Sequence, residues 1–168
     1  MKKLIYLILL GTALLSASCS KKPVCCVLPQ PVVMTAQKNG VAWQSVIVQS
    51  TRSNNNISIV AMDLENSTNS PKDSLSINLA YTGLGNYSPT AQQVAYTTFA
   101  NGVKTKYVLD TNFYNRISIT EFAVQHNPAT TNPDPTELKA TFTLRFIDPA
   151  NNTSVMLSDG KFTAYLSN

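Results

Sequence analysis

An alternation of apolar and polar residues with a period of two most restricts the fold of this 168-residue chain. The clearest run covers residues 75–81, where every second side chain is apolar and those between are small or polar. Similar runs cover 138–146 and 162–166. Because successive side chains of a strand point to opposite faces, each run predicts a strand with one buried face and one solvated face.

Turn-forming residues separate these runs and set the expected number of strands. Asn101-Gly102 predicts a two-residue hairpin between two of them. No segment has the periodicity of a convincing amphipathic helix. The expected fold is all-β, with about eight antiparallel strands in a meander-like β-sandwich or closed β-barrel. The weaker strand runs cover 41–49, 57–62, 94–99, 103–109 and 117–124.

The first eighteen residues have the order of a secretory signal peptide. Lys2 and Lys3 precede an apolar run over 4–15, and Ser16-Ala17-Ser18 supply small residues before a cysteine. The run is shorter than the roughly 20 residues that a transmembrane helix needs. We therefore expect 1–18 to be a lipoprotein signal peptide and Cys19 to carry the lipid. An ordinary secretory peptide cut near Ser18 is the alternative.

A tether is expected between the lipid and the folded domain. Residues 19–37 contain three prolines, which favour an extended chain. Cys25 and Cys26 also lie there, and their neighbouring Cα atoms, about 3.8 Å apart, do not suit a relaxed disulfide. Free thiols, a strained vicinal disulfide and an intermolecular bridge all remain open for this pair. The expected single β domain then covers 38–168.

The charge distribution argues against nucleic-acid binding. The chain has 13 Lys and Arg against 9 Asp and Glu, but four of the lysines lie in the expected signal and tether. From Lys38 onward, basic and acidic side chains are equal in number. Proteins that bind nucleic acids need a basic face to neutralise phosphates, so we expect no such partner.

No catalytic or metal-binding set is found in the sequence. His126 is the single histidine, and no Gly-x-Ser-x-Gly elbow supports a Ser-His-Asp triad. Asp63 and Glu65 read as a solvated strand end rather than a glycosidase pair. Glu121 interrupts an apolar face, which a β-bulge or a strand end would explain. We expect no enzyme, no catalytic residues, no metal and no cofactor.

Three short motifs, at 39–43, 84–87 and 159–162, read Asn-Gly-Val-Ala-Trp, Leu-Gly-Asn-Tyr and Asp-Gly-Lys-Phe. In these motifs the segment 38–168 resembles an uncharacterised family of Bacteroidota lipoproteins, a domain of unknown function. It departs in having Asp159 where Asn is expected, and in lacking a glycine before the run at 138–146. The resemblance implies an all-β, lipid-anchored domain without an assigned active site.

Two further expectations concern export. Surface-exported Bacteroidota lipoproteins usually carry acidic residues after the lipid cysteine, whereas this chain has Lys21 and Lys22 there. We therefore expect an outer-membrane lipoprotein that faces the periplasm, with the cell surface as the alternative. Asp73-Ser74-Leu75 resembles a short O-glycosylation sequon of exported proteins, which makes Ser74 a candidate modification site.

These features predict a non-enzymatic envelope lipoprotein. It would contact the membrane through the lipid on Cys19 and would bind an envelope protein or a small ligand, or play a structural role. The alternative is a lipocalin-like carrier of a small apolar ligand, because an eight-strand meander with Trp43 on its first strand is compatible with one. We expect Trp43 to plug the core near one end.

Overall fold

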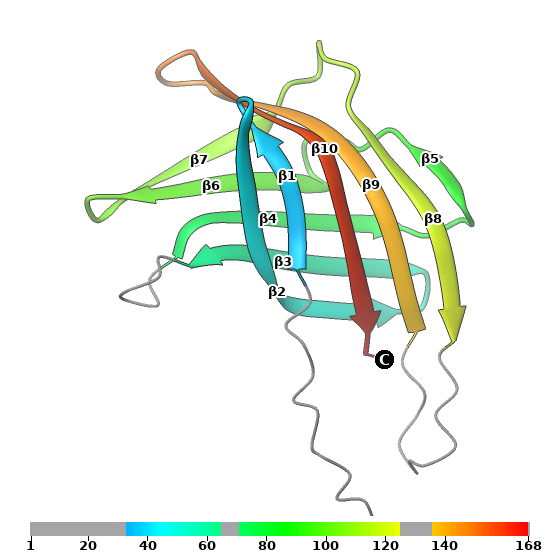
Figure 1. The fold of residues 1–168 in the computed structure, drawn as a ribbon. Helices are drawn as coiled ribbons and strands as arrows, with labels where there is room; N and C mark the ends of the chain where they lie inside the picture. Colours follow the sequence, from blue (N-terminus) through cyan, green and yellow to red (C-terminus); the bar gives the residue numbers. More distant parts are fainter. Residues whose placement is uncertain (1–32, 65–70, 125–135, 168) are drawn as a thin grey trace, which may run out of the picture. The chain divides into compact units, whose positions relative to one another are not determined.

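Ten antiparallel strands make up the part of the chain that the computed structural model describes, residues 33–64, 71–124 and 136–167 (Figure 1). The expected all-β class is confirmed. No helix in these ranges is long and apolar enough to cross a membrane. The strands are β1 (Val33–Lys38), β2 (Val41–Ser53), β3 (Asn56–Leu64), β4 (Pro71–Ala80), β5 (Gly85–Tyr87), β6 (Val94–Ala100), β7 (Val103–Leu109), β8 (Arg116–Val124), β9 (Thr136–Asp148) and β10 (Thr153–Leu166).

The ladders close into a ring. They run in the order β10-β1-β2-β3-β4-β6-β7-β9, and β9 pairs again with β10. β8 pairs with β9 beside β7, and β5 pairs with the free edge of β8. Most neighbours are consecutive in the sequence, as a meander requires, whereas β5 and β8 lie outside the ring.

Two layers result from this ring, because two long strands take part in both. β2 pairs first with β1 and then with β3, and β9 pairs with β8 and then with β7. In Figure 1, β1, β10, β9 and β8 form one layer, and β3, β4, β6 and β7 cross behind it at a steep angle. The domain is therefore a β-sandwich whose layers are joined at their corners.

Bulges allow the long strands to bend. The β2–β3 register shifts between Ile47 and Gln49, where β2 passes from one layer to the other. The β9–β10 register shifts between Leu157 and Gly160, and Asp159 takes a left-handed φ of 52° there. A Cβ on Gly160 would overlap the Phe142 ring unless that ring shifted, so glycine is favoured at this bulge.

The apolar side chains of the alternating runs fill the space between the layers. Leu75, Ile77 and Leu144 are fully buried, and Tyr96 stacks on Phe146 with ring centroids 5.5 Å apart. A fully buried side chain of this size contributes about 1.5–3 kcal/mol to stability. Trp43 is 5% exposed, as expected of a core plug.

Asparagines in the left-handed region form the tight turns. Asn101 (φ 52°) and Gly102 (φ 75°) connect β6 to β7, so the predicted hairpin is confirmed. Asn39 and Gly40 connect β1 to β2 in the same way, with φ values of 50° and 81°. Asn tolerates positive φ better than most residues, and Gly adopts it freely.

The structure differs from the predicted strand set in three places, at β1, β5 and β10. We expected about eight strands, and the described residues contain ten. Residues 33–37, expected in the tether, belong to β1, so the predicted domain start at residue 38 is too late. The three-residue β5 was not predicted, and β10 begins at Thr153, nine residues before the expected run at 162–166.

Candidate binding cleft

A cleft opens where β2 separates from β3. The β2–β3 ladder ends at the pair Val46–Met62. The residues of β2 before Val46 pair with β1, and the residues of β3 after Met62 pair with β4. The cleft has a volume of about 780 Å³, within the usual range of about 300–1,000 Å³ for small-ligand sites. Its lining consists of Lys38, Asn39, Val41, Ala42, Trp43, Gln44, Ser45, Val46, Asp63, Lys72 and Asp73.

An ion pair crosses the cleft from one layer to the other. Lys38, the last residue of β1, places its Nζ atom 2.5 Å from Oδ2 of Asp73 on β4. The Asp73 side chain is 2% exposed and that of Lys38 is 26% exposed. The ammonium also lies 5.6 Å from the centroid of the Tyr96 ring, at a distance that suits a cation–π contact.

Tyr96 supplies a neutral hydroxyl behind this pair. Burial and the neighbouring Asp73 carboxylate both raise the pKa of Tyr96 far above its ordinary value. The hydroxyl therefore keeps its proton at any physiological pH. Although it lies beside Asp73, it makes no hydrogen bond of standard geometry within the described residues.

Asp63 is the carboxylate of the cleft that lacks an ion pair among the described residues. It lies directly across the β3–β4 ladder from Asp73. Burial and the Asp73 charge raise the pKa of Asp63, and Lys72 and Lys38 oppose this shift. Like charges opposite each other destabilise a sheet, so a cationic group placed beside Asp63 would be favourable.

Two polar groups of β2 lie buried along the cleft wall. Nε1 of Trp43 and Oγ of Ser45 have no hydrogen-bond partner among the described residues. Such groups in folded proteins are usually paired with protein, water or ligand atoms. The cleft is thus lined by charged and polar groups on both sides, and it does not resemble an apolar ligand cavity.

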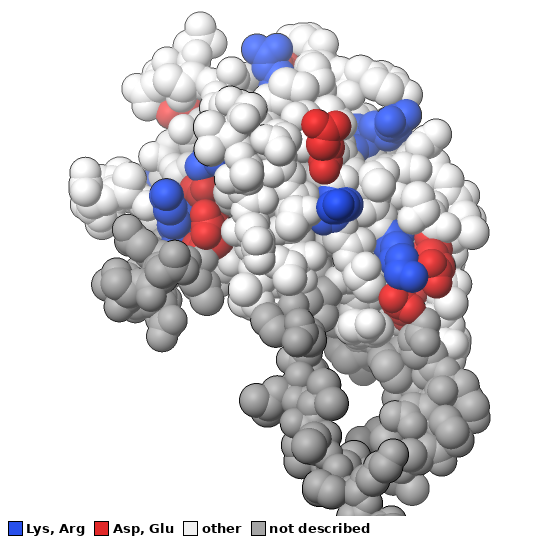
Figure 2. Space-filling model, in the orientation of Figure 1, with Lys and Arg blue, Asp and Glu red and all other residues white. Residues whose placement is uncertain are grey.

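Charged side chains are otherwise sparse on this face of the domain. Figure 2 shows them in small groups of both signs, separated by uncharged surface. An ion pair joins Lys139 of β9 to Glu121 of β8, with Nζ 2.8 Å from Oε2. The β8–β9 register shifts between Ile119 and Glu121, so of the two explanations expected for Glu121, a bulge or a strand end, the bulge is present.

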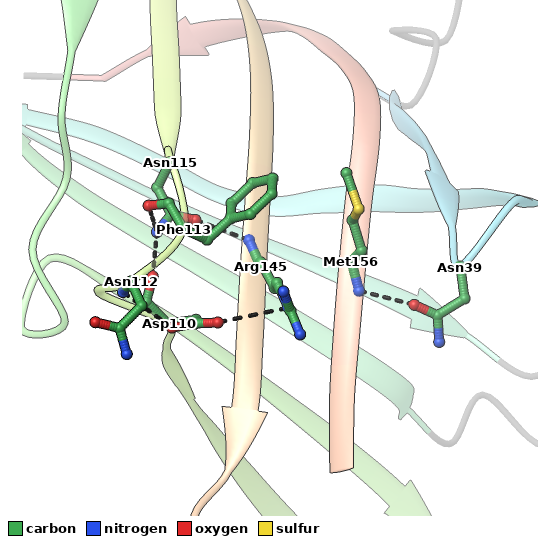
Figure 3. A network of polar contacts seen from close by, with 7 residues as sticks. All are labelled: Asn39, Asp110, Asn112, Phe113, Asn115, Arg145 and Met156. Atoms are coloured by element: carbon green, nitrogen blue, oxygen red, sulfur yellow. Dashed lines mark hydrogen bonds and ion pairs between the residues drawn. The ribbon is translucent and has the colours of Figure 1, made fainter. Parts of the chain in front are cut away.

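A polar network holds the loop before β8 in place (Figure 3). The buried Asn115 donates through Nδ2 to the carbonyl oxygens of Asp110 and Phe113, at 2.6 and 3.1 Å. Its Oδ1 accepts the N–H of Arg145 at 2.8 Å. All three hydrogen bonds of this side chain join it to backbone groups of its own loop or of β9, so we assign this network to loop formation.

A separate contact in Figure 3 fixes one end of the cleft. Oδ1 of Asn39, in the β1–β2 turn, accepts the backbone N–H of Met156 on β10 at 2.8 Å. The backbone N–H of Asn39 in turn donates to the carbonyl oxygen of Met156 at 2.9 Å. The hairpin that carries Lys38 and the start of β2 is therefore held against β10.

The predicted site residues have different outcomes. Cys19, Cys25, Cys26 and His126 lie outside the described residues, so their predicted roles remain predictions. Ser74 lies on β4, between Met62 of β3 and Thr97 of β6, with a half-buried side chain. This places it inside the sheet rather than at the expected junction of a loop and a strand.

The described residues contain no group of three or more His, Cys, Asp or Glu side chains able to hold a metal ion. No family model matches the chain, and no curated protein and no solved structure matches it. The features of this chain that bear on its function are therefore the cleft and the sequence motifs.

Proposed function

We propose that this chain is a lipid-anchored extracytoplasmic protein that binds a partner through the cleft between β2 and β3–β4 and catalyses no reaction. The observation that carries this proposal is the separation of β2 from β3, which leaves a polar cleft in an otherwise closed ring of strands. The signal-like N-terminus and Cys19 support the anchored location.

Membrane attachment would determine where in the cell envelope the β domain lies. The lipid on Cys19 would hold the chain in the outer membrane, with the β domain in the periplasm. Proteinase K digestion of intact and lysed cells tests this, with Cys19→Ser as the anchor control. Protection in intact cells alone supports the periplasmic side, and degradation in intact cells places the domain on the surface.

A carrier of apolar ligands is the less favoured alternative. A lipocalin-like carrier needs an apolar cavity inside its ring of strands. Here the inward-facing side chains of β3, β4 and β9 are buried in one hydrophobic core cluster. The cleft at the corner of the ring presents Lys38, Asp63 and Asp73 instead. These groups suit a polar partner.

Ala42 offers a direct test of binding through the cleft, because it is exposed and lines the cleft. We expect Ala42→Arg to obstruct the cleft without disturbing the core, and Ala42→Ser to leave it open. In crosslinked cells, the full chain and the Ser variant should recover the same envelope partner, and the Arg variant should lose it. Equal recovery by both variants would show that the cleft is not the binding site.

A further inference from the structure

Within the described residues, one edge of β2 is left without a partner strand near the β1–β2 hairpin, as the alternation of backbone hydrogen bonds along the hairpin indicates. Residues that flank a two-residue turn exchange backbone hydrogen bonds, which makes Lys38 and Val41 such a pair. In an antiparallel ladder the residues of one strand direct their N–H and C=O groups alternately to either side. Trp43 and Ser45 therefore also direct their backbone groups toward β1.

The intervening residues, Ala42 and Gln44, direct their backbone groups to the opposite edge, into the cleft. The backbone groups of Val46 point to this same edge, and Val46 is the residue at which the pairing with Met62 of β3 begins. No strand in the described residues pairs with Ala42 or Gln44 on that side. Each residue thus presents one N–H and one C=O along the cleft, and both residues are exposed.

The cleft runs along this free edge of β2. Its wall includes six consecutive residues of β2, Val41 to Val46, so it follows the backbone of the strand. From the first to the last Cα atom, these six residues span about 17 Å. Proteins usually protect such an edge with lysine, proline or a short strand, and 41–45 contains neither lysine nor proline.

We infer that an extended polypeptide segment of a partner protein, carrying a lysine or arginine, adds to β2 along Ala42 and Gln44 as an additional strand. This inference rests on the proposed function and names the partner and its binding mode. Backbone N–H and C=O groups at an edge are complementary to the backbone of another strand. The basic side chain suits Asp63, which lies opposite Asp73 and makes no ion pair among the described residues, with Lys72 and Lys38 offsetting only part of the local negative charge.

Proline at Gln44 separates strand addition from other modes of binding. Gln44→Pro removes the N–H that faces the cleft and leaves the bonds to β1 intact, and edge strands tolerate such a proline. Gln44→Thr keeps the N–H and serves as the matched control. Circular dichroism of both full-length variants establishes that the fold is retained.

The probe is a displayed library of random nine-residue peptides, selected against the full chain in detergent. We expect selected peptides to be enriched in Lys and Arg, and to bind the Pro variant at least tenfold more weakly than the Thr variant. Asp63→Asn should abolish the enrichment in basic residues. Failure to select any peptide, or equal binding to the Pro and Thr variants, would overturn strand addition.

Two outcomes separate this inference from the proposed function. If Ala42→Arg loses the crosslinked envelope partner and Gln44→Pro retains it, the cleft binds a partner and strand addition is wrong. If light scattering shows a dimer of the full chain that Gln44→Pro dissociates, the edge is occupied by a second copy, and the assignment to another protein is wrong.

Discussion

Lys38 of β1 and Asp73 of β4 form an ion pair that joins the two layers at the corner where the β2–β3 ladder ends, with Nζ 2.5 Å from Oδ2. The hairpin that carries Lys38 is held to β10 through Asn39. The hairpin of β1 and β2 is thereby joined to both β4 and β10 beside the cleft. The pair thus stabilises the fold and also shapes the proposed binding site.

Removal of the lysine should destabilise the domain. Lys38→Met leaves the Asp73 carboxylate buried without its cation, which costs about 2 kcal/mol for a partly exposed pair. Urea unfolding of the full chain measures this loss. The double variant Lys38→Met/Asp73→Leu should recover much of the stability, because both charges are then absent. A double variant less stable than the single variant would contradict this account of the pair.

The bulge in β10 should not tolerate a side chain at Gly160. A methyl group there overlaps the Phe142 ring, and overpacking of this kind costs about 1–3 kcal/mol. We expect Gly160→Ala to lower the melting temperature and Phe142→Leu to offset part of that loss in combination. Equal melting temperatures for wild type and Gly160→Ala would show that the two strands can move apart.

Asn115 should be needed for the loop before β8 (Figure 3). Asn115→Ala leaves the carbonyl oxygen of Asp110 and the N–H of Arg145 without their side-chain partner. The expected cost is about 1–3 kcal/mol in the free energy of unfolding. Asn112→Ala is the control, because the Asn112 side chain is exposed and only its backbone N–H bonds to Asp110. A similar loss in both variants would argue against the assigned role.

Asp63 should make the stability depend on pH. Its pKa is raised above 3.8 by burial and by Asp73, so the folded state binds the proton more tightly than the unfolded state. The contribution of Asp63 to the free energy of unfolding therefore falls as the pH rises above 3.8. Asp63→Asn should remove that fall and be the more stable protein at neutral pH, as urea unfolding at several pH values would show.

Asp148 is the matched control, because its pKa shifts in the opposite direction. Hydrogen bonds from the Asn151 side chain and the Ala150 N–H lower the pKa of Asp148 below 3.8. Its contribution is present at neutral pH and is lost as the pH falls below 3.8. Asp148→Asn should therefore be less stable than wild type at neutral pH, with a difference that shrinks in acid. The same pH trend for both variants would contradict these environments.

The strands with long alternating patterns could be predicted because the pattern reports directly which face is buried. Residues 138–146 lie within β9, and Leu138, Phe142 and Leu144 are all buried as expected. The first strand was missed because Pro29 and Pro31 suggested a linker and β1 has only six residues. Asn39-Gly40 was a readable hairpin signal for it.

The cleft could not be predicted in the same way. It depends on where β2 leaves β3, and that position is set by pairings between residues far apart in the sequence. Lys38 and Asp73 are 35 residues apart and belong to no local motif. No sequence pattern around Lys38 or Asp73 predicts a contact between them. The two residues come together only when the strands close into the ring.

Hydrogen exchange at the backbone of β2 reports which amides lack a partner strand, and so shows whether the edge along the cleft is free. In the full chain without a partner, the amides of Trp43 and Ser45 should exchange slowly, since they bond to β1. The amides of Ala42 and Gln44 should exchange rapidly and become slow when a selected peptide is bound. Slow exchange at all four amides without a peptide would show that the edge is already paired and would contradict the account.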